Sequence, residues 1–228
     1  MRLNEDSYRK KVRAGWLGKC IGGNLGAIPE CLKKRSYFLK PEDFMPEKML
    51  ANDDLDLQLV WLQVLLDKGL SFTSDDLMEE FIKCYPANPN EYGYGKRNYR
   101  RGIKPPVSGT FANEFFMNSM GCPIRAEIWA MICPGRPEKG IELAYRDGCL
   151  DHGEESIYAE QYITALESLS FLSQDRLELI KKASEYIPET SRIYHVISDV
   201  SGAFEKGAEL EKVMDYLETE YGDVDCSI

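Results

Sequence analysis

The sequence predicts an all-α fold, in one compact multi-helix domain spanning residues 1–228. Apolar residues recur at three- and four-residue spacing along most of the chain, and no segment shows the sustained alternation of a half-buried strand. Capping residues precede these apolar runs, and Gly or Pro follows several of them. The length suits a single domain of ordinary size with a substantial core.

Three helices are predicted in the first part of the chain. The first covers Tyr8 to Ile21 and runs into the glycine-rich stretch "IGGNLGAIPE". The second begins at Asp53 and stops at Gly69, and four leucines mark one of its faces: Leu55, Leu59, Leu62 and Leu66. The third lies in "TSDDLMEEFIKCY", with an apolar stripe through Leu77, Phe81 and Ile82 and a stop at Pro86.

The segment Pro86–Gly109 is predicted to be a long loop, because it is rich in Gly, Pro, Asn and Tyr. Loops of this length are often functional. Seven further helices are expected after it: Thr110–Ser119, Pro123–Ile132, Pro137–Cys149, Glu154–Leu172, Gln174–Tyr186, Ser191–Phe204 and Ala208–Tyr221.

Charge and cysteine usage exclude several classes of protein. The formal net charge of −10 argues against a general affinity for nucleic acid or for anionic membranes. No apolar run is long enough for a membrane span, and "MRLNEDSYRK" lacks the apolar core of a signal peptide. The seven cysteines include no C-x-x-C pair, so we expect reduced thiols in a cytoplasmic protein and no structural zinc site.

Acidic residues crowd the start of the second helix, in "NDDLD". One interpretation is a favourable helix start, because Asn caps and acidic residues complement the helix dipole. The other is a metal site, because Asn52, Asp53 and Asp54 offer the oxygen ligands that a hard divalent cation takes. One segment cannot complete such a site, and Glu30 is the natural partner from elsewhere, although a glutamate there also suits an ordinary surface position.

The stretch "EYGYGKRNYRRGIKPP" interleaves tyrosines with Lys and Arg. Aromatic and basic side chains together can stack on bases and neutralise phosphates. Against a net charge of −10, contact with one phosphate-bearing ligand is the more compatible interpretation. The fragment "GYGK" does not have the spacing of a phosphate-binding Walker loop.

Two other helix starts carry candidate binding residues. Met120, Gly121 and Cys122 precede Pro123, a favourable first helical residue, and backbone N–H groups at such a start can hold an anion. His152 follows Asp151 at another helix start, where a histidine also serves as a cap or a packed polar residue.

In combination, these motifs resemble the ADP-ribosylglycohydrolase family, which also includes crystallin J1-type proteins. The resemblance rests on the order and spacing of four blocks from residue 14 to about 162. They are "AGWLGKCIGGNLGAIPE", "NDDLDLQLVWL", "NYRRGIKPPVSGTFANEFFMNSMGCPIRAEIWAMICPGRPEKGIELAYRDG" and "DHGEESIYAEQY".

The resemblance implies an all-helical, magnesium-dependent hydrolase that cleaves an N- or O-glycosidic bond of ADP-ribose. Glu30, Asn52, Asp53 and Asp54 fall where the family places one half of a two-magnesium centre. Glu30 would act as general base or orient the water, and Asp53 and Asp54 would hold the metal. Met120 to Cys122 would lie along the diphosphate and ribose, with His152 at the edge of the ADP-ribose pocket.

Two departures from the family pattern weaken the expected activity. Leu55 stands where the family usually has a threonine, and no Asp-x-Asp-Thr cluster occurs in the sequence; "YGDVDCSI" imitates it poorly. We therefore expect the family fold to be incomplete at its C-terminus, with weak magnesium binding and little activity. The alternative is a non-catalytic helical module that binds ADP-ribose, a related nucleotide or a protein partner.

Overall fold

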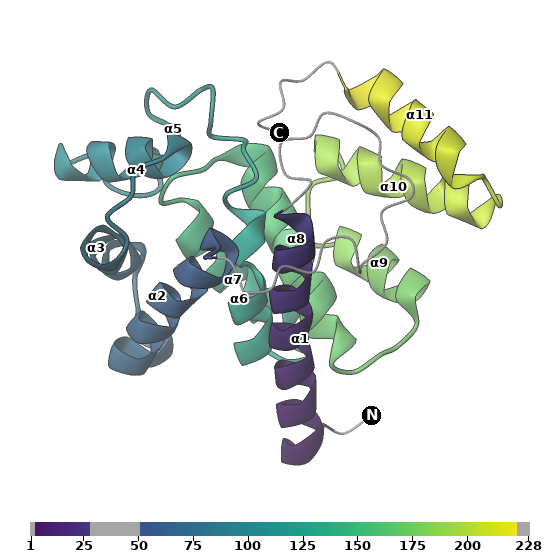
Figure 1. Cartoon of the computed structure of the whole chain (residues 1–228), viewed down its shortest axis with the longest axis horizontal. Coiled ribbons are helices and arrows are strands. Elements are labelled where there is room, and N and C mark those ends of the chain that lie inside the picture. Colours follow the sequence, from purple (N-terminus) through teal and green to yellow (C-terminus); the bar gives the residue numbers. More distant parts are fainter. Residues whose placement is uncertain (1–2, 28–50, 223–228) are drawn as a thin grey trace.

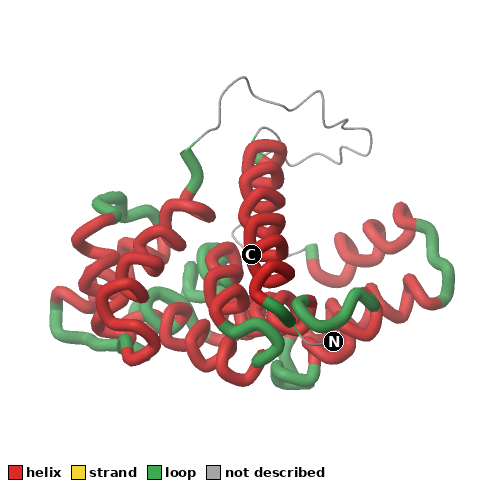
Figure 2. Tube along the Cα trace, turned by 90° about the horizontal axis from the view of Figure 1, so that it is seen from below, coloured by secondary structure: helices red, strands yellow, loops and turns green. Residues whose placement is uncertain are grey.

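The computed structural model describes residues 3–27 and 51–222, and within these ranges every regular element is a helix (Figures 1 and 2). The predicted all-α fold is confirmed. The α-helices are α1 Glu5–Gly26, α2 Asp53–Lys68, α3 Ser74–Cys84, α4 Asn90–Arg100, α5 Val107–Thr110, α6 Glu127–Ile132, α7 Pro137–Gly148, α8 Glu154–Ser170, α9 Arg176–Ser184, α10 Arg192–Glu205 and α11 Leu210–Tyr221. Two single turns of 3₁₀-helix, η2 Gly69–Ser71 and η3 Pro123–Arg125, complete the set.

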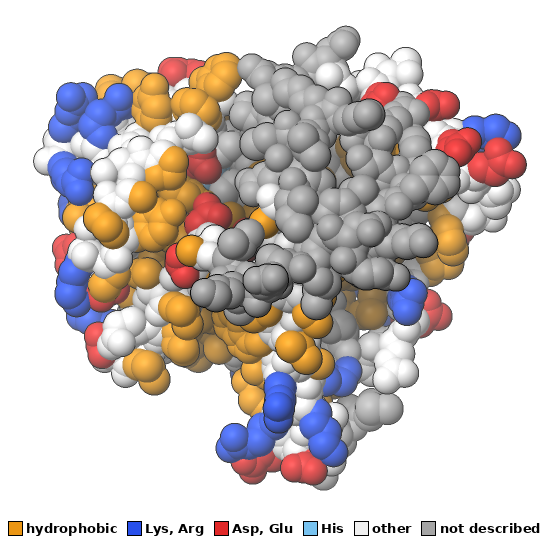
Figure 3. Space-filling view, in the orientation of Figure 1, with side chains coloured by type: hydrophobic (Ala, Val, Ile, Leu, Met, Phe, Trp, Pro, Cys, Tyr) orange, Lys and Arg blue, Asp and Glu red, His pale blue; other side chains and the backbone are white. Residues whose placement is uncertain are grey.

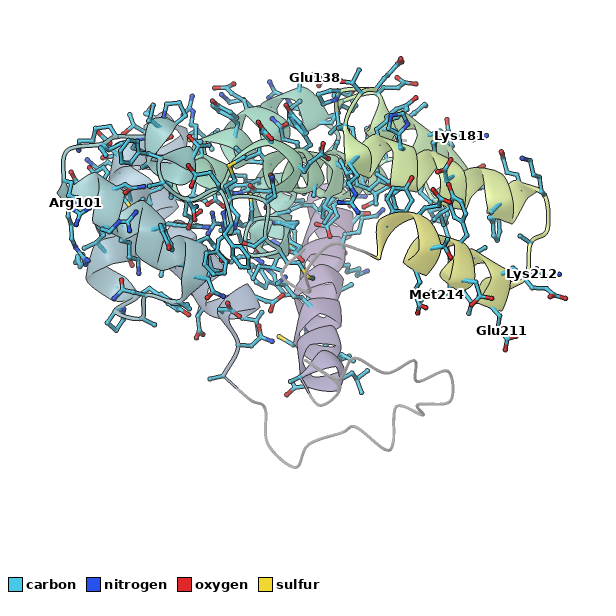
Figure 4. All side chains as sticks on the ribbon, turned by 90° about the horizontal axis from the view of Figure 1, so that it is seen from above. Arg101, Glu138, Lys181, Glu211, Lys212 and Met214 are labelled. Carbon is cyan, nitrogen blue, oxygen red and sulfur yellow. The ribbon has the colours of Figure 1, made fainter. Side chains whose placement is uncertain are left out.

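Helices α6, α7 and α8 form the middle of the molecule, and α8 packs closely on α7, α6 and α9. Helices α2 to α5 lie on one side and α9 to α11 on the other (Figure 1). Arg101, at the end of α4, and Lys212, on α11, mark opposite ends of the molecule (Figure 4). None of the described helices combines the length and the apolar character needed to cross a membrane.

Helix α2 has the predicted bounds but buries a different face. Leu57 and Trp61 have no exposed surface and join the main core. The leucine face is exposed instead, with Leu59 at 58%, Leu62 at 40% and Leu66 at 73%. The helix is apolar almost all round, so leucine spacing alone could not identify the core side; the larger Trp61 side chain, which contacts Phe81 edge-on, lies on it.

Helix α3 follows the prediction closely. Thr73 and Asp76 form a reciprocal capping box, and the predicted stripe is buried at Leu77 and Phe81 and half-buried at Ile82. The reciprocal hydrogen bonds at the start of α3 hold the pKa of the Asp76 carboxyl below its usual value, chiefly through the backbone N–H of Thr73.

The predicted loop Pro86–Gly109 is wrong over more than half of its length, because it contains α4 and the start of α5. Glycines lower helix propensity, but Gly95 is required by packing: a side-chain carbon there would lie 2.8 Å from the Leu150 carbonyl oxygen. Tyr92 and Lys96 are buried on the same helix. These tertiary contacts therefore explain why the segment forms a helix although its composition is typical of a loop.

The predicted helix Thr110–Ser119 is also wrong. Only α5 forms, and the chain after it runs in turns. The Asn98 amide donates to the carbonyls of Ser108 and Phe111 at 2.8 and 2.7 Å, and Ala112 adopts a left-handed φ of 50°. Side-chain hydrogen bonds and a positive φ replace the regular helical ladder here.

The remaining predicted helices are confirmed to within a few residues, with one division. The segment predicted as one helix over Pro123–Ile132 is split into η3 and α6. Cys20, Cys84, Cys122, Cys133 and Cys149 are free thiols, as expected. No residue of α10 or α11 is buried.

Candidate functional site

A cavity of about 730 Å³ opens between segments that are far apart in the sequence. Its walls come from the glycine-rich end of α1, the acidic start of α2, the start of α4 and the turn before η3. The lining residues are Gly22, Gly23, Gly26, Ala27, Ala51, Asn52, Asp53, Asp54, Asp56, Tyr85, Asn90, Glu91, Tyr92, Ser119, Met120, Gly121 and Ile124.

The α2 wall is organised by its cap. Asn52 is in an extended conformation, and its side-chain oxygen accepts a hydrogen bond from the Asp54 N–H at 2.8 Å. Asp53 accepts one from the Tyr92 hydroxyl at 3.4 Å. A side-chain carbon at Gly23 would lie 2.7 Å from the Asn52 amide nitrogen, so that glycine lets α1 approach the cap. The capping interpretation of the acidic segment is thus confirmed for Asn52.

Lys19 ties α1 to this wall. Its ammonium lies 2.7 Å from Glu127 Oε1 and 3.6 Å from Asp54 Oδ1, and it donates to the Ile124 carbonyl at 2.7 Å. Buried Gln58 donates to the backbone carbonyl of Asp54 and to the other Glu127 oxygen. Asp54 therefore already has a cationic neighbour, whereas the partner of Asp53 among the described residues is the Tyr92 hydroxyl.

His152 lies behind the cavity and has no exposed surface. Its Nε2 is 3.2 Å from the Ser119 hydroxyl and 3.7 Å from Glu91 Oε1, and both of those residues line the cavity. Its Nδ1 is 2.7 Å from Asp151 Oδ1. Burial acts to lower the pKa of His152, but Asp151 and Glu91 together raise it above its usual value.

A cluster of buried charged side chains contacts His152 through Asp151. Arg125 forms a two-pronged hydrogen bond with Asp151, at 2.6 and 3.2 Å, and its Nε lies 2.9 Å from Asp147 Oδ1. The contact between Arg125 Nε and Asp147 Oδ1 is close, but its angle is not that of a hydrogen bond. Neither atom therefore has a hydrogen-bond partner among the described residues. The Trp129 indole N–H donates to Asp147 at 3.0 Å, and none of these side chains reaches solvent.

The three acids of the buried cluster respond differently to burial. Burial acts to raise the pKa of each. For Asp151, Arg125 and His152 reverse this effect and hold the pKa well below its usual range. For Asp147, burial prevails over Arg125 and the pKa rises to about 6. The pKa of Glu160 rises well above its usual value, because of burial and the nearby Asp147 carboxylate.

The described residues do not complete a metal centre. Within residues 3–27 and 51–222, no three His, Cys, Asp or Glu side chains come close enough together to hold a metal ion. Asp53 and Asp54 nevertheless offer hard oxygen ligands at the cavity wall, of the type magnesium prefers. Glu30, the predicted general base and third ligand, lies outside the described residues.

The comparison with protein families decides the assignment. The ADP-ribosylglycohydrolase family model matches residues 4–224, nearly the whole chain. The chain belongs to this family. Comparison with curated proteins and with solved structures gives no significant match.

The structure of this family member places the predicted residues in two layers. Asn52, Asp53 and Asp54 line the cavity together with Met120 and Gly121, although some seventy positions of sequence separate the two groups. These residues form the cavity-facing layer.

Cys122 and His152 form the second layer and have no exposed surface. The Cys122 thiol faces Glu160 Oε2 at 2.7 Å, and His152 contacts the cavity wall through Ser119 and Glu91. The binding roles of Cys122 and His152 stay predictions. The helix start proposed at Pro123 is the single 3₁₀ turn η3, so it lacks the aligned peptide dipoles of a longer helix.

Sequence reasoning missed Ser119 as a cavity residue, and it included Glu91 and Tyr92 only as part of the basic, tyrosine-rich stretch expected to contact a phosphate-bearing ligand. Glu91 and Tyr92 lie in the segment predicted as a loop, and Ser119 lies at the end of a predicted helix that does not form. The tyrosines of the basic stretch have intramolecular partners: Arg97 lies over the Tyr94 ring at 4.4 Å and Lys104 over Tyr99 at 3.6 Å. Lys and Arg side chains gather on the α3–α5 side of the surface (Figure 3).

Proposed function

We propose that the chain is a hydrolase of the ADP-ribosylglycohydrolase type, which binds ADP-ribose and cleaves the N- or O-glycosidic bond at its anomeric carbon. The observation that supports this is the shared cavity of the acidic α2 start and the Met120–Gly121 turn. Three of the four blocks of the family resemblance meet there: the glycine-rich end of α1, the acidic start of α2 and the Met120–Gly121 turn.

Electrostatics supports a role for magnesium in this proposal. Among the described lining residues, Asp53, Asp54, Asp56 and Glu91 are acidic and none is Lys or Arg. A diphosphate entering such a cavity would be repelled unless a cation accompanied it. Magnesium is commonly held by one or two carboxylates together with substrate phosphates, which suits Asp53 and Asp54.

Within this proposal each group of the cavity has a task. Asp53, oriented by the Tyr92 hydroxyl, and Asp54, held beside Lys19, would hold the metal with Asn52. Bound magnesium would polarise ribose hydroxyls or a water. Glu30 would accept the proton of the attacking water. The Met120–Gly121 backbone would lie along the diphosphate and ribose.

The second candidate is a non-catalytic module that binds ADP-ribose or a related nucleotide. One observation favours it: the described carboxylates do not gather into a group of three around one point, and Asp54 already faces the Lys19 ammonium. Such a chain would keep the binding cavity without the complete metal centre that hydrolysis needs.

Titration of the purified chain with ADP-ribose, with and without magnesium, tests binding, and ADP-ribose release from ADP-ribosylated arginine and serine peptides tests hydrolysis. Release that requires magnesium and is lost in Asp53→Asn supports the hydrolase. Binding without release supports the module. The matched control is Asp67→Asn, at the exposed far end of the same helix, which should behave as wild type. A chain that neither binds nor releases ADP-ribose would contradict the hydrolase, and it would contradict the module as well if ADP also fails to bind.

A further inference from the structure

Glu91 is an unusual member of the cavity wall. It lies in the first turn of α4, lines the cavity and is only 6% exposed. Its Oε1 faces His152 Nε2 at 3.7 Å, but its Oε2 is buried and has no hydrogen-bond partner in the described part of the chain. Buried carboxylate oxygens are costly to leave unpaired, so this atom requires an explanation.

The neighbouring backbone leaves room for this carboxylate. A side-chain carbon at Gly121 would overlap Glu91 Oε1 and would lie 2.9 Å from the Tyr92 hydroxyl. The glycine therefore allows the cavity wall to close around Glu91 without displacing it. On the other side, His152 is fixed by Asp151, which is itself held by Arg125. The carboxylate is thus supported on one oxygen and unpaired on the other.

We propose that Glu91 is a further ligand-contact residue, whose free Oε2 accepts a hydrogen bond from a sugar hydroxyl of the bound ligand. This inference rests on the proposed binding of ADP-ribose. A carboxylate attracts hydroxyl donors and repels phosphate oxygens, so Glu91 contacts the terminal ribose and not the diphosphate. A cation is the less suitable occupant, because no two further acidic, His or Cys side chains among the described residues join Glu91 around one point.

The test compares two ligands that differ in the terminal ribose. Calorimetric titrations with ADP-ribose and with ADP, both in magnesium, are carried out on wild type, Glu91→Gln and the control Glu114→Gln, an exposed acid outside the cavity. We expect Glu91→Gln to weaken ADP-ribose binding at least about tenfold, the scale of one hydrogen bond to a charged group. Its affinity for ADP should stay within about twofold of wild type, a change below that scale.

A second variant separates contact from folding. Glu91→Asp keeps the charge but shortens the side chain, and it should also lose affinity for ADP-ribose selectively, while thermal melts verify that each variant is folded. Equal loss for ADP and ADP-ribose would show a structural role or a contact with the adenosine ribose, and either would overturn the inference. Unchanged ADP-ribose affinity in Glu91→Gln would overturn it while leaving the proposed function intact. A wild-type chain without affinity for ADP-ribose would overturn both.

Discussion

Two groups of carboxylates lie within a short distance of each other and have opposite surroundings. Asp53 and Asp54 stand at the open cavity wall, half-buried, with one long hydrogen bond and one distant ammonium as partners. Asp147 and Asp151 have no exposed surface and share the guanidinium of Arg125. Among the described residues, the first group keeps oxygen lone pairs without a partner, whereas the oxygens of the second group face buried side chains, although Asp147 Oδ1 meets Arg125 Nε without forming a hydrogen bond.

This difference in surroundings predicts that one group of carboxylates determines the stability of the fold and the other determines ligand binding. A charge removed from water must be compensated inside the protein, so the cluster around Arg125 should govern unfolding. A carboxylate that remains at a cavity wall can exchange water for a ligand at little cost, so Asp53 should govern binding. The variants below test this separation, in order of decreasing effect on the free energy of unfolding.

Replacement of Arg125 should have the largest effect. Arg125→Met removes the guanidinium that contacts both Asp147 and Asp151 and leaves these two buried acids without it. We expect a loss of about 3–5 kcal/mol in the free energy of unfolding, measured by urea denaturation. The control Arg100→Met, at an exposed site on α4, should change it by less than about 0.5 kcal/mol. Equal losses in the free energy of unfolding for Arg125→Met and Arg100→Met would contradict the structural role assigned to the buried carboxylates.

The pH dependence of stability should follow the buried acids. The pKa of Asp147 rises from 3.8 to about 6, so between these values the folded state keeps a proton that the unfolded state releases. Stability therefore falls as pH rises through this window, by up to about 3 kcal/mol. Glu160 acts in the same direction, and so does His152, whose contribution is lost as pH rises past its raised pKa.

Asp151 acts in the opposite direction. Its lowered pKa gives stability that is present above pH 3.8 and is lost as the pH falls further. Denaturation between pH 3 and 8 should thus show maximal stability in mildly acidic solution, and Asp147→Asn should flatten the decline towards neutrality. Stability that climbs steadily from pH 5 to 7 would contradict the assigned protonation of this cluster.

Lys19→Met should have an intermediate effect. It removes a nearly buried ammonium, its short contact with Glu127 and its hydrogen bond to Ile124, and it releases Asp54. We expect a loss of about 1–3 kcal/mol by denaturation. Lys10→Met, an exposed lysine of the same helix, serves as its control. If Lys19 also positions Asp54, magnesium titration of the variant should differ from wild type, and that of the control should not.

Asp53→Asn should have the smallest effect on stability, at most about 1 kcal/mol, because it loses only a favourable charge at a helix start and a 3.4 Å hydrogen bond. The same variant should strongly weaken magnesium-supported ADP-ribose binding in calorimetry. A large loss of stability with unchanged binding would place Asp53 with the structural carboxylates.

The sequence predicted most helices well because their limits are local. Caps such as Asn52 and Thr73 and stops such as Gly69 act on their own helix. The misses depend on distant partners: α4 forms with Gly95 against the Leu150 carbonyl, and the Phe111 carbonyl is taken by the Asn98 amide.

The residues of the site likewise divide into those that a local sequence pattern predicts and those that depend on distant partners. The acidic residues at the start of α2 were visible as a motif, and the structure places them on the cavity wall. Glu91 could not be identified from the sequence, because its unpaired oxygen exists only once α4 packs against His152. A local pattern predicts which residues are available, whereas the fold decides which of them remain unsatisfied.

Helix α1 forms one wall of the cavity, yet none of its residues is buried. Its described contacts to the core include polar ones, among them Tyr8 to the Met131 carbonyl and Lys11 to the Ser170 carbonyl. Segments attached with little apolar burial open at lower free energy than the whole domain. In hydrogen exchange, the amides of α1 should therefore exchange well before those of α2, and a ligand that bridges the two helices should slow α1 selectively.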